Sequence, residues 1–539
     1  MCGILLIVES YRDVHDEYGS ILERIRRRGP DFFKIHSLDN GIILVVGVLW
    51  LQGSQITPQP HSNDVGGYLL WNGDAYGGLE EMRNGDSDTQ TISRTLEKLE
   101  PQEFFDQIRG PFAFSYTQGE FIWFGRDYFG RHSLLFFQNE EGLLALSSVG
   151  DDSHPWLQVP TKGIYRYSII YKRLTLFPWN DASVSSEASP FGNLPLEISD
   201  SKLSSPIIKL SLTNELSSLP WIANAIEEKW RDDVVILQYI HKHSDLIKTF
   251  EQVVRDSVLT RVEHKPPFCG HCLPSLTPCS HSKIGILFSG GLDSSYLAYI
   301  LHSVLSPEES IVLFNVAFGD AVENVPDRIT GRKALKELEK VCPQRNFIFE
   351  AINISKEELV ATRQIEKLDE LLLPSGTVLD DSIGCALWFA AGKRNGEHMP
   401  RVLLIGSGID EQLGGYSRHR AVFNRDGWNA LFHEIRMEID RISERNLGRD
   451  NRIISDHGVA SRIPFLDERV VNFLNSVPLP QKMDLSLRRG LGEKLLLRAA
   501  AYDAGLISIS SEPKRAIQFG SRIAKIENKK EKGSDIAVR

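Results

Sequence analysis

The seven residues from Ser289 to Ser295 read Ser-Gly-Gly-Leu-Asp-Ser-Ser, and they separate a short apolar run from a helical stretch. A strand, a tight Gly-Gly turn and a helix start leave several backbone N–H groups free in one concavity, where the helix dipole favours an anion. The carboxylate of Asp293 beside a phosphate suits a bridging Mg²⁺. A plain helix cap needs one Ser or Asp rather than a cluster, so that alternative is weaker. We predict a phosphate-binding loop formed by Ser289, Gly290, Gly291, Asp293, Ser294 and Ser295.

Cys2 is a second residue whose type and position could do chemistry. After removal of Met1, its thiol would lie beside a free α-amino group. Such an amine has an unperturbed pKa of about 7.7–8.0 and can act as a general base near neutral pH. One residue would then supply both a nucleophile and its base.

Three of the six cysteines fall in the segments Cys269-Gly270-His271-Cys272 and Cys279-Ser280-His281. The C-x₂-C spacing suits half of a zinc site, which Cys279 or a nearby His could complete. The second half lacks the usual paired spacing, and neighbouring prolines indicate an irregular loop. The sequence leaves metal binding open and favours a reduced surface loop.

The elements that must position these groups change character along the chain. Up to about residue 180, apolar and aromatic runs separated by turn residues predict packed antiparallel sheets, with helices at Tyr18–Arg27 and Thr89–Leu99. From about residue 220, helices alternate with strands, which predicts a doubly wound parallel sheet. Those strands are Ile284–Phe288, Ile311–Ala317, Phe347–Ile352 and Val402–Ile405. We expect domains at 2–185 and 245–525, a Ser/Pro/Asp-rich linker at 186–244 and a disordered tail at 526–539.

The composition excludes several classes of function. A net charge of −10 without a basic stripe argues against nucleic-acid binding. No apolar stretch approaches the ~20 residues of a membrane span, and the N-terminus lacks the features of a secretory signal. We therefore expect a soluble, cytoplasmic protein with no membrane partner; the sequence does not indicate an oligomeric state.

Four segments of the first 130 residues resemble, in order, the signatures of class II glutamine amidotransferases, which are N-terminal-nucleophile hydrolases with an αββα sandwich. They are Arg28-Gly29-Pro30-Asp31, Trp71-Asn72-Gly73-Asp74, Ser87-Asp88-Thr89 and Gly125-Arg126-Asp127-Tyr128-Phe129-Gly130. The resemblance implies that Cys2 is the nucleophile, that Asn72 and Gly73 form the oxyanion hole, and that Asp88 binds the glutamine α-ammonium. Taken singly, Asn72-Gly73 would also suit a hairpin turn and Asp88 a helix N-cap.

The phosphate loop resembles that of ATP pyrophosphatases, and together with a class II glutaminase it resembles the glutamine-hydrolysing asparagine synthetase family. Three later segments agree: Gly406-Ser407-Gly408-Ile409-Asp410-Glu411, Arg462-Ile463-Pro464-Phe465-Leu466-Asp467 and Gly492-Glu493-Lys494-Leu495-Leu496-Leu497-Arg498. The resemblance implies an ATP-pyrophosphatase domain that uses ATP and Mg²⁺ to join aspartate to ammonia from glutamine through β-aspartyl-AMP. It places Gly408 in the nucleotide site, Asp293 and Asp410 at the metal, and Lys494 at the reacting phosphate.

Two positions depart from the family pattern. Val48 stands where the family has the arginine that clamps the glutamine carboxylate, and Ser407 stands where the working synthetases have Glu. Four further segments, at 325–332, 379–386, 443–450 and 513–522, taken together resemble a divergent subgroup of the family, the asparagine synthetase domain-containing proteins. Two functions remain in view: an asparagine synthetase, and a catalytically impaired nucleotide-binding pseudoenzyme with a regulatory or scaffolding role. An intermediate alternative is an active adenylating enzyme that uses another acid as acceptor.

Overall fold

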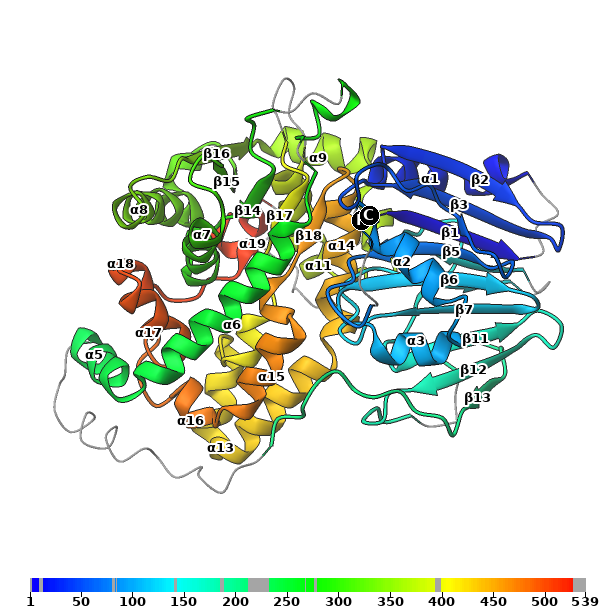
Figure 1. Ribbon diagram of the computed structural model, residues 1–539. Helices are drawn as coiled ribbons and strands as arrows, with labels where there is room; N and C mark the ends of the chain where they lie inside the picture. The colour runs from blue at the N-terminus through cyan, green and yellow to red at the C-terminus, as the bar shows by residue number, and fades with distance from the viewer. Residues whose placement is uncertain are drawn as a thin grey trace.

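The computed structural model describes residues 2–8, 13–79, 83, 85–139, 143–184, 189–211, 232–266, 268–275, 279–392 and 399–526. An N-terminal lobe built on two sheets lies beside a C-terminal lobe built on a third (Figure 1). Met1 and residues 527–539 of the expected tail lie outside the described residues. No helix within the described ranges is both long enough and apolar enough to cross a membrane.

The N-terminal lobe stacks two mostly antiparallel sheets, with strand orders β10-β8-β9-β1-β3-β2 and β13-β12-β11-β7-β6-β5-β4. The first sheet contains β1 (Gly3–Val8), β2 (Phe32–Ser37), β3 (Ile42–Val48), β8 (Leu135–Gln138), β9 (Leu144–Ser147) and β10 (Leu157–Gln158). The second contains β4 (His61–Ser62), β5 (Tyr68–Gly73), β6 (Phe112–Gln118), β7 (Phe121–Arg126), β11 (Gly163–Ser168), β12 (Arg173–Pro178) and β13 (Leu196–Ile198). The antiparallel sheets predicted from the sequence are therefore present.

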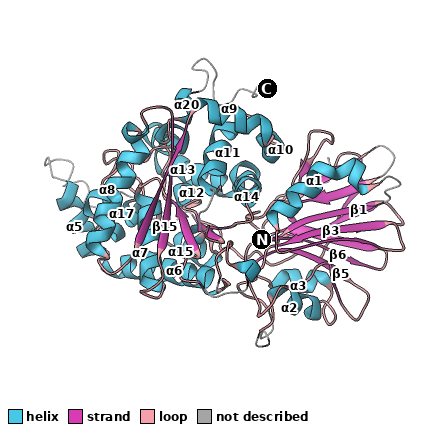
Figure 2. Cartoon of the chain, turned by 90° about the horizontal axis from the view of Figure 1, so that it is seen from above, coloured by secondary structure: helices cyan, strands magenta, loops and turns pink. Residues whose placement is uncertain are grey.

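Both faces of strand β1 are buried, which explains why its sequence is apolar throughout and does not alternate with polar residues. Ile4 and Leu6 pack between the two sheets, whereas Leu5 and Ile7 pack on the outer face against helix α1 (Val14–Arg28). On the far side, α2 (Asp88–Thr95) and α3 (Pro101–Gln107) cover the second sheet. The lobe is thus a helix–sheet–sheet–helix stack, and the start of β1 lies at its edge facing the C-terminal lobe (Figure 2).

The C-terminal lobe has a parallel sheet of order β16-β15-β14-β17-β18, with helices on both faces. Its strands are β14 (Ile284–Leu287), β15 (Ile311–Phe318), β16 (Phe347–Ile354), β17 (Val402–Leu404) and β18 (Ala460–Arg462). The principal helices are α6 (Ser244–Glu263), α7 (Leu292–Val304), α8 (Pro326–Val341), α9 (Lys356–Ile365), α10 (Leu368–Leu372), α11 (Val378–Ala391), α13 (Ser417–Asp440), α14 (Gly448–Ser455), α15 (Glu468–Ser476) and α17 (Leu495–Asp503). Shorter helical segments are α12 (Ile409–Gln412), α16 (Leu479–Lys482), α18 (Ile507–Ser510), α19 (Ile517–Gly520) and α20 (Ile523–Ile526). The strand order starts centrally at β14 and winds outward in both directions, as the alternating pattern predicted.

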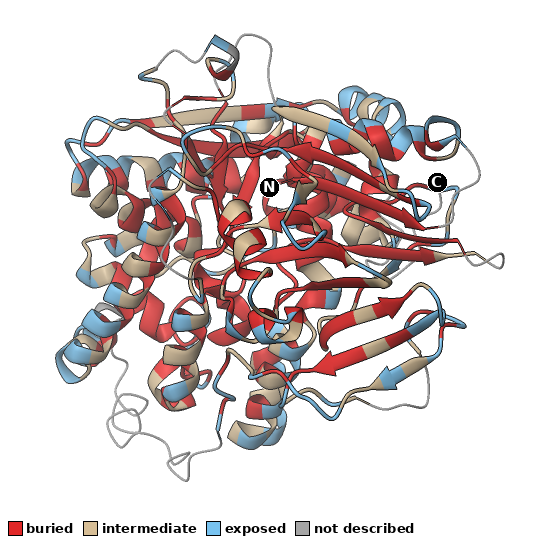
Figure 3. Ribbon diagram, turned by 45° about the vertical axis from the view of Figure 1, so that its right-hand side comes forward, coloured by how far each residue is buried: buried red, intermediate tan, exposed pale blue. Residues whose placement is uncertain are grey.

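Strand residues of this sheet divide between two cores. Ile286 and Leu313 pack with α6, α7 and α17, while Phe314 and Leu403 pack on the other face with α11 and α14. The second core also contains Leu5 and residues of α1, so it runs without a break from one lobe to the other. Figure 3 shows the continuous buried interior across both lobes.

Part of the stretch expected to be a linker is packed against the lobes. Strand β13 extends the second sheet beside β12, and Phe191, Leu194 and Leu203 are buried. Further on, α5 (Asp232–Lys242) contributes Ile236 to the C-terminal core. The polar composition of residues 186–244 predicted a spacer because it averages over isolated apolar residues, and some of those described, such as Phe191 and Ile236, are buried in a neighbouring core.

Ion pairs between largely buried side chains join the two lobes. Arg24 of α1 pairs with Asp456, Arg131 with Glu468, Arg401 with Asp31, and Arg462 with Asp74, and each arginine side chain is at most 7% exposed. Removing one member of such a pair leaves an uncompensated buried charge, so these contacts specify one relative placement of the lobes.

Candidate active sites

The predicted phosphate loop connects β14 to α7 at the carboxyl edge of the parallel sheet. Gly290 has φ of 74°, and a Cβ there would lie 2.4 Å from the backbone of Gly331, so glycine is needed for both conformation and space. Asp293 lies in the first turn of α7. The N–H of Gly291 lies 3.3 Å from the hydroxyl oxygen of Ser289, which accepts its hydrogen bond. The loop therefore has the strand–turn–helix form that its sequence predicted.

Two aspartates and two lysines from four separate segments meet beside this loop. The Nζ atom of Lys494 lies 2.7 Å from both carboxylate oxygens of Asp293 and 2.6 Å from Oδ1 of Asp410. Lys514 lies 2.7 Å from the other oxygen of Asp410 and 3.7 Å from Asp293. Burial alone would raise the pKa of Asp410, but the two lysines outweigh it and hold the pKa well below its ordinary value. Asp410 is therefore charged, and the carboxylates of both aspartates converge on the Lys494 side chain.

Lys494 is a buried residue rather than an exposed helix position. Its side chain is 2% exposed, and its backbone has φ of 57° immediately before α17. Its N–H donates to the carbonyl of Leu413, which follows α12. This left-handed turn directs the side chain toward Asp293 and Asp410, so local backbone geometry positions the cation.

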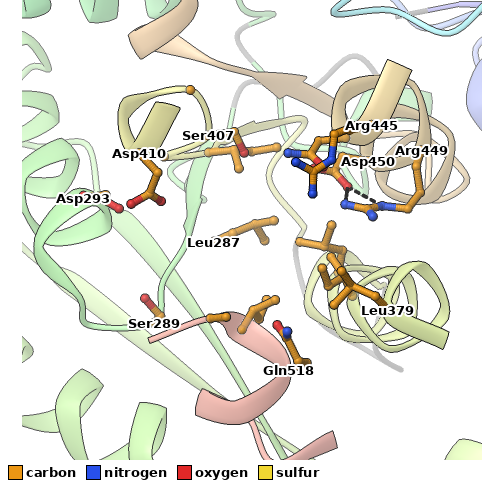
Figure 4. A pocket seen from close by; sticks show the side chains of 18 of the residues that line it. Leu287, Ser289, Asp293, Leu379, Ser407, Asp410, Arg445, Arg449, Asp450 and Gln518 are labelled. Atoms are coloured by element: carbon orange, nitrogen blue, oxygen red, sulfur yellow. Dashed lines mark hydrogen bonds and ion pairs between the residues drawn. The ribbon is translucent and has the colours of Figure 1, made fainter. Parts of the chain in front are cut away.

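A cavity of about 780 Å³ opens from this cluster across the C-terminal lobe. Ser289, Asp293 and Asp410 lie at one side of it, and Arg445, Arg449 and Asp450 lie at the opposite wall (Figure 4). Arg449 pairs with Asp450 at 2.8 Å and also contacts Asp380. Ser407 lines the cavity between the two sides. The cavity therefore has a cation-containing wall facing the phosphate loop.

The predicted loop residues do not all reach this cavity. Ser289, Asp293 and Ser294 line it, and Gly291 lines a smaller cavity of about 40 Å³ beside Lys494. The hydroxyl of Ser295 is buried without a hydrogen-bond partner and lines neither cavity. Gly408 does line the large cavity. Its φ is 95°, and a Cβ at this position would lie 2.4 Å from the Leu466 side chain, so both conformation and space require glycine.

Cys2 lies at the start of β1, against the end of β5. Its backbone N–H donates to Oδ1 of Asn72 at 2.9 Å, and Nε2 of Gln59 lies 3.7 Å from its sulfur. Burial raises the pKa of the Cys2 thiol above its ordinary value. Asn72 is fully buried, and its Nδ2 group has no hydrogen-bond partner among the described residues. Asn72 and Gly73 belong to β5 and pair with Ala113 and Phe112, so they do not form a hairpin turn.

Asp88 is the first residue of α2, and Ser87 rather than Asp88 caps that helix. The Asp88 carboxylate accepts hydrogen bonds from the indole N–H of Trp71 at 3.0 Å and from the backbone of Ala75 at 3.2 Å. Burial, reinforced by the nearby negative charge of Asp74, raises the pKa of Asp88 to about 6. Its carboxylate is thus held beside Cys2 in a setting where an added cation would be favourable.

The cavity that contains Cys2 and Asp88 is small, at about 40 Å³. Val48 lines it, as the sequence comparison with the family motif indicated, and its described lining contains no Lys or Arg. Gln52 also lines it, but the Gln52 amide already donates to Asp74 at 2.8 Å. The described lining therefore offers no lysine or arginine for a glutamine carboxylate.

Sequence reasoning missed two contributions that come from distant segments. Lys514 lies in a segment without a predicted role, yet it completes the aspartate–lysine cluster. Arg462 lies at the end of β18 and contacts Asp74, next to Gly73, through Nε at 3.2 Å and Nη2 at 3.0 Å. Its motif was recognised, but no sequence signal links it to a residue nearly four hundred positions earlier.

The two lobes correspond to two known domain families. The glutamine amidotransferase domain family matches residues 1–154, and the asparagine synthase family matches residues 279–433 and 424–529. The fold and the two sites thus define a protein with an amidotransferase domain followed by an asparagine synthase domain.

Full-length relatives make the family more specific. Asparagine synthetase domain-containing protein 1 of Mus musculus is 36% identical over 99% of this chain and 98% of its own length. The protein of the same name from Homo sapiens is 35% identical over 99% of this chain and 97% of its own length. A glutamine-hydrolysing asparagine synthetase of Gallus gallus is 28% identical over 45% of this chain and 40% of its own length. The chain belongs to the asparagine synthetase domain-containing protein family.

Proposed function

We propose that this chain is an ATP-dependent ligase that amidates aspartate to asparagine, with ammonia released from glutamine at Cys2. The observation that carries the proposal is the convergence of Asp293, Asp410, Lys494 and Lys514 beside the phosphate loop, at one end of the large cavity. Four charged groups from distant segments are held together there, and two of them, Lys494 and Asp410, are buried, at a cost that a packed core would avoid. Perturbed, buried charges in a cavity are typical of catalytic sites.

In the ligase reaction, the β-carboxylate of aspartate attacks the α-phosphate of ATP. The bond between that phosphorus and the bridging oxygen breaks, and pyrophosphate leaves with its charge toward the loop N–H groups. Ammonia then attacks the acyl carbon of β-aspartyl-AMP, and AMP leaves. Lys494 and Lys514 lie where they would neutralise charge on the phosphates through both steps.

The donor set also fits the Mg²⁺ that accompanies ATP. Asp293 and Asp410 supply carboxylate oxygens, the ligands that Mg²⁺ prefers, and both reach within 2.7 Å of one Lys494 ammonium group. These two residues would hold the metal, which would supply further charge neutralisation at the phosphates.

The far wall of the cavity supports an acidic amino acid as acceptor. Arg445 and Arg449 line it, and Asp410 lies at the opposite side (Figure 4). Lys514 contacts Asp410 at 2.7 Å, so an acceptor with two carboxylates finds cations on both sides. Asp450 and Asp380 on the same wall are suited to an α-ammonium group. Ser407, which also lines the cavity, carries no charge. We therefore assign recognition of the charged acceptor to the arginines and aspartates of this wall.

For glutamine hydrolysis, Cys2 would attack the side-chain amide while its amine, exposed after removal of Met1, takes the thiol proton. The Oδ1 atom of Asn72 already holds the Cys2 nitrogen, and the unpartnered Nδ2 group can donate to the oxyanion that forms. Asp88 would bind the α-ammonium group. Glutamate and ammonia are the products, and the overall fold would be that of an N-terminal-nucleophile hydrolase.

The test measures pyrophosphate and asparagine from the purified chain supplied with ATP and Mg²⁺, with or without aspartate. Glutamine and ammonium chloride are compared as nitrogen donors, and Lys494→Ala serves as the inactive control. We expect aspartate-dependent pyrophosphate with ammonium, and a weaker glutamine-driven rate because the Cys2 cavity lacks a described cation. Pyrophosphate that does not depend on aspartate with either donor would refute the proposed acceptor.

A further inference from the structure

A cluster of four sulfur and nitrogen ligands lies outside both candidate active sites. The sulfurs of Cys269, Cys272 and Cys279 and a ring nitrogen of His281 all lie within 4.8 Å of one another. Cys269 and Cys272 follow α6, and Cys279 and His281 come just before β14. The sequence offered Cys269 and Cys272 as half of a zinc site that Cys279 or a nearby His could complete, and it favoured a reduced surface loop. The structure brings both Cys279 and His281 to the first pair.

The separations within the cluster match a shared metal ion. Zinc–sulfur bonds of about 2.3 Å and zinc–nitrogen bonds of about 2.0–2.1 Å place the sulfur and nitrogen of a tetrahedral site about 3.6 Å apart. The Nδ1 atom of His281 lies 3.5 Å from the sulfur of Cys272 and 3.7 Å from that of Cys269. These two sulfur–nitrogen separations therefore match those of a tetrahedral site.

The backbone around the sulfurs is also arranged as a ligand loop. The N–H of Cys269 donates to the sulfur of Cys279 at 3.3 Å, and such a hydrogen bond stabilises a thiolate. Tight turns follow each cysteine of the first pair, with Leu273 donating to the carbonyl of Cys269 and Ser275 to that of Cys272. Lys283 adds a cation that donates to the carbonyl of Cys279 at 3.1 Å.

We propose that Cys269, Cys272, Cys279 and His281 bind one structural Zn²⁺. Three thiolates and an imidazole select a soft or borderline metal, and four protein ligands leave no open position for catalysis. Ligation replaces the thiol protons by the metal, with no change of oxidation state.

The site lies where it can connect the lobes. Phe268 and Leu273 flank Cys269 and Cys272, and both pack against Trp50 of the N-terminal lobe, with ring centroids of Phe268 and Trp50 6.1 Å apart. Trp50 also lines the cavity that contains Cys2. A metal that fixes the loop would thus hold one wall of the Cys2 cavity from the C-terminal side.

The first experiment determines the metal content of the full chain purified from zinc-supplemented cells without chelators. We expect about one zinc per chain, as in other four-ligand sites. His281→Ala should lose the zinc, while His271→Ala, which changes an exposed histidine outside the cluster, should retain it. Equal zinc in the two variants, or a different metal in the unchanged protein, would overturn the proposal.

A second measurement does not depend on variants that fold. Alkylation and peptide mass spectrometry of the unchanged protein should show the three cluster cysteines protected with zinc and reactive after chelation. Cys342 and Cys385, which lie elsewhere and are buried, should not respond to the chelator. Co²⁺ added to the chelated protein should give the visible spectrum of a tetrahedral thiolate site. A disulfide within the cluster, or protection that chelation leaves unchanged, would exclude the metal.

Discussion

Removing the charge of Arg462 should destabilise the contact between the lobes, and the structure allows the size of the effect to be worked out. Arg462 is 1% exposed and Asp74 is 2% exposed, so neither charge is solvated by water. Besides its two contacts with Asp74, the guanidinium donates to the carbonyl of His264 at 2.9 Å and to that of Arg261. Arg462→Met would leave Asp74 with Gln52 and Tyr76 as its neutral donors. Breaking a buried pair in this way costs about 3–5 kcal/mol.

The effect has a defined pH dependence. Burial alone would raise the pKa of Asp74, but Arg462 outweighs it and holds the pKa well below its ordinary value. A depressed carboxyl pKa contributes stability above the unfolded value of about 3.9, and that stability is lost as pH falls through the folded value. The difference in the free energy of unfolding between the unchanged protein and Arg462→Met should therefore have its full size at pH 7 and shrink below about pH 4.

The assay is a double-mutant cycle of Arg462→Met and Asp74→Asn, followed by thermal unfolding at several pH values. At about 2 °C for each kcal/mol in a large chain, the single change should lower the melting temperature by about 5–10 °C. Arg173→Met is the matched control. Arg173 pairs with Glu197, both side chains are more than half exposed, and the pair should contribute nothing measurable to the stability of the fold. Additive losses in the double variant, or a loss that is equal at pH 3 and pH 7, would refute the reasoning.

Four further predictions concern single side chains. Cys2→Ala should abolish glutamine-driven amidation and leave the ammonia-driven rate, as measured by asparagine formed with each donor. Lys494→Met should lower pyrophosphate release by about 10²–10³-fold, the usual loss when a stabilising donor at the transition state is removed. Because the pKa of Asp88 is raised to about 6, its carboxylate becomes protonated below that pH, so the KM for glutamine should rise there while the KM for ammonia does not follow it. Lys482 is buried with its pKa lowered to about 7, so Lys482→Met should stabilise the fold by about 2–4 kcal/mol at pH 7 and by less near pH 10, in denaturant titrations.

Each of these predictions has a control and a contrary outcome. Loss of both activities in Cys2→Ala would argue against two separable sites, and Cys342→Ala should change neither. Lys333→Met removes an exposed lysine of α8 and should leave pyrophosphate release unaltered. A glutamine KM that is flat between pH 5 and pH 8 would contradict the role of Asp88. For Lys482, the sign follows from linkage: a lowered lysine pKa penalises the fold below the unfolded value of about 10.4, so destabilisation at pH 7 would be the contrary result.

The local parts of both sites could be predicted from the sequence because short-range sterics and hydrogen bonding define them. Ser289–Ser295 follows a strand and begins a helix, and its glycines are required wherever such a turn meets a neighbouring backbone, as Gly290 does against Gly331. The burial of β1 followed from an apolar run with no polar face. The two-residue segment Asn72-Gly73 was less certain, since a turn and a strand end share that sequence; pairing with β6 selected the strand.

The short strand β18 shows where such prediction fails. Ala460–Arg462 has neither length nor strong strand propensity, and it becomes a strand because β17 offers it an open edge. Its register then directs Arg462 toward Asp74 of the other lobe. Residues 189–203 join the N-terminal lobe for a similar reason, because apolar side chains such as Phe191, Leu194 and Leu203 find cores that other segments have built. Leu210, further on, packs in a core of the C-terminal lobe.

The sequence by itself determined the domain order, the sheet types and the residues able to act as nucleophile, oxyanion donor and phosphate ligand, because these depend on residue type and near neighbours. Only the tertiary structure decided which distant groups share a site. Lys514 meets Asp410, Arg462 meets Asp74, and His281 meets Cys269 and Cys272 because chain segments without a common local pattern are packed together. Charge, burial and ligand spacing arise from that packing, and the proposed chemistry of each site rests on them.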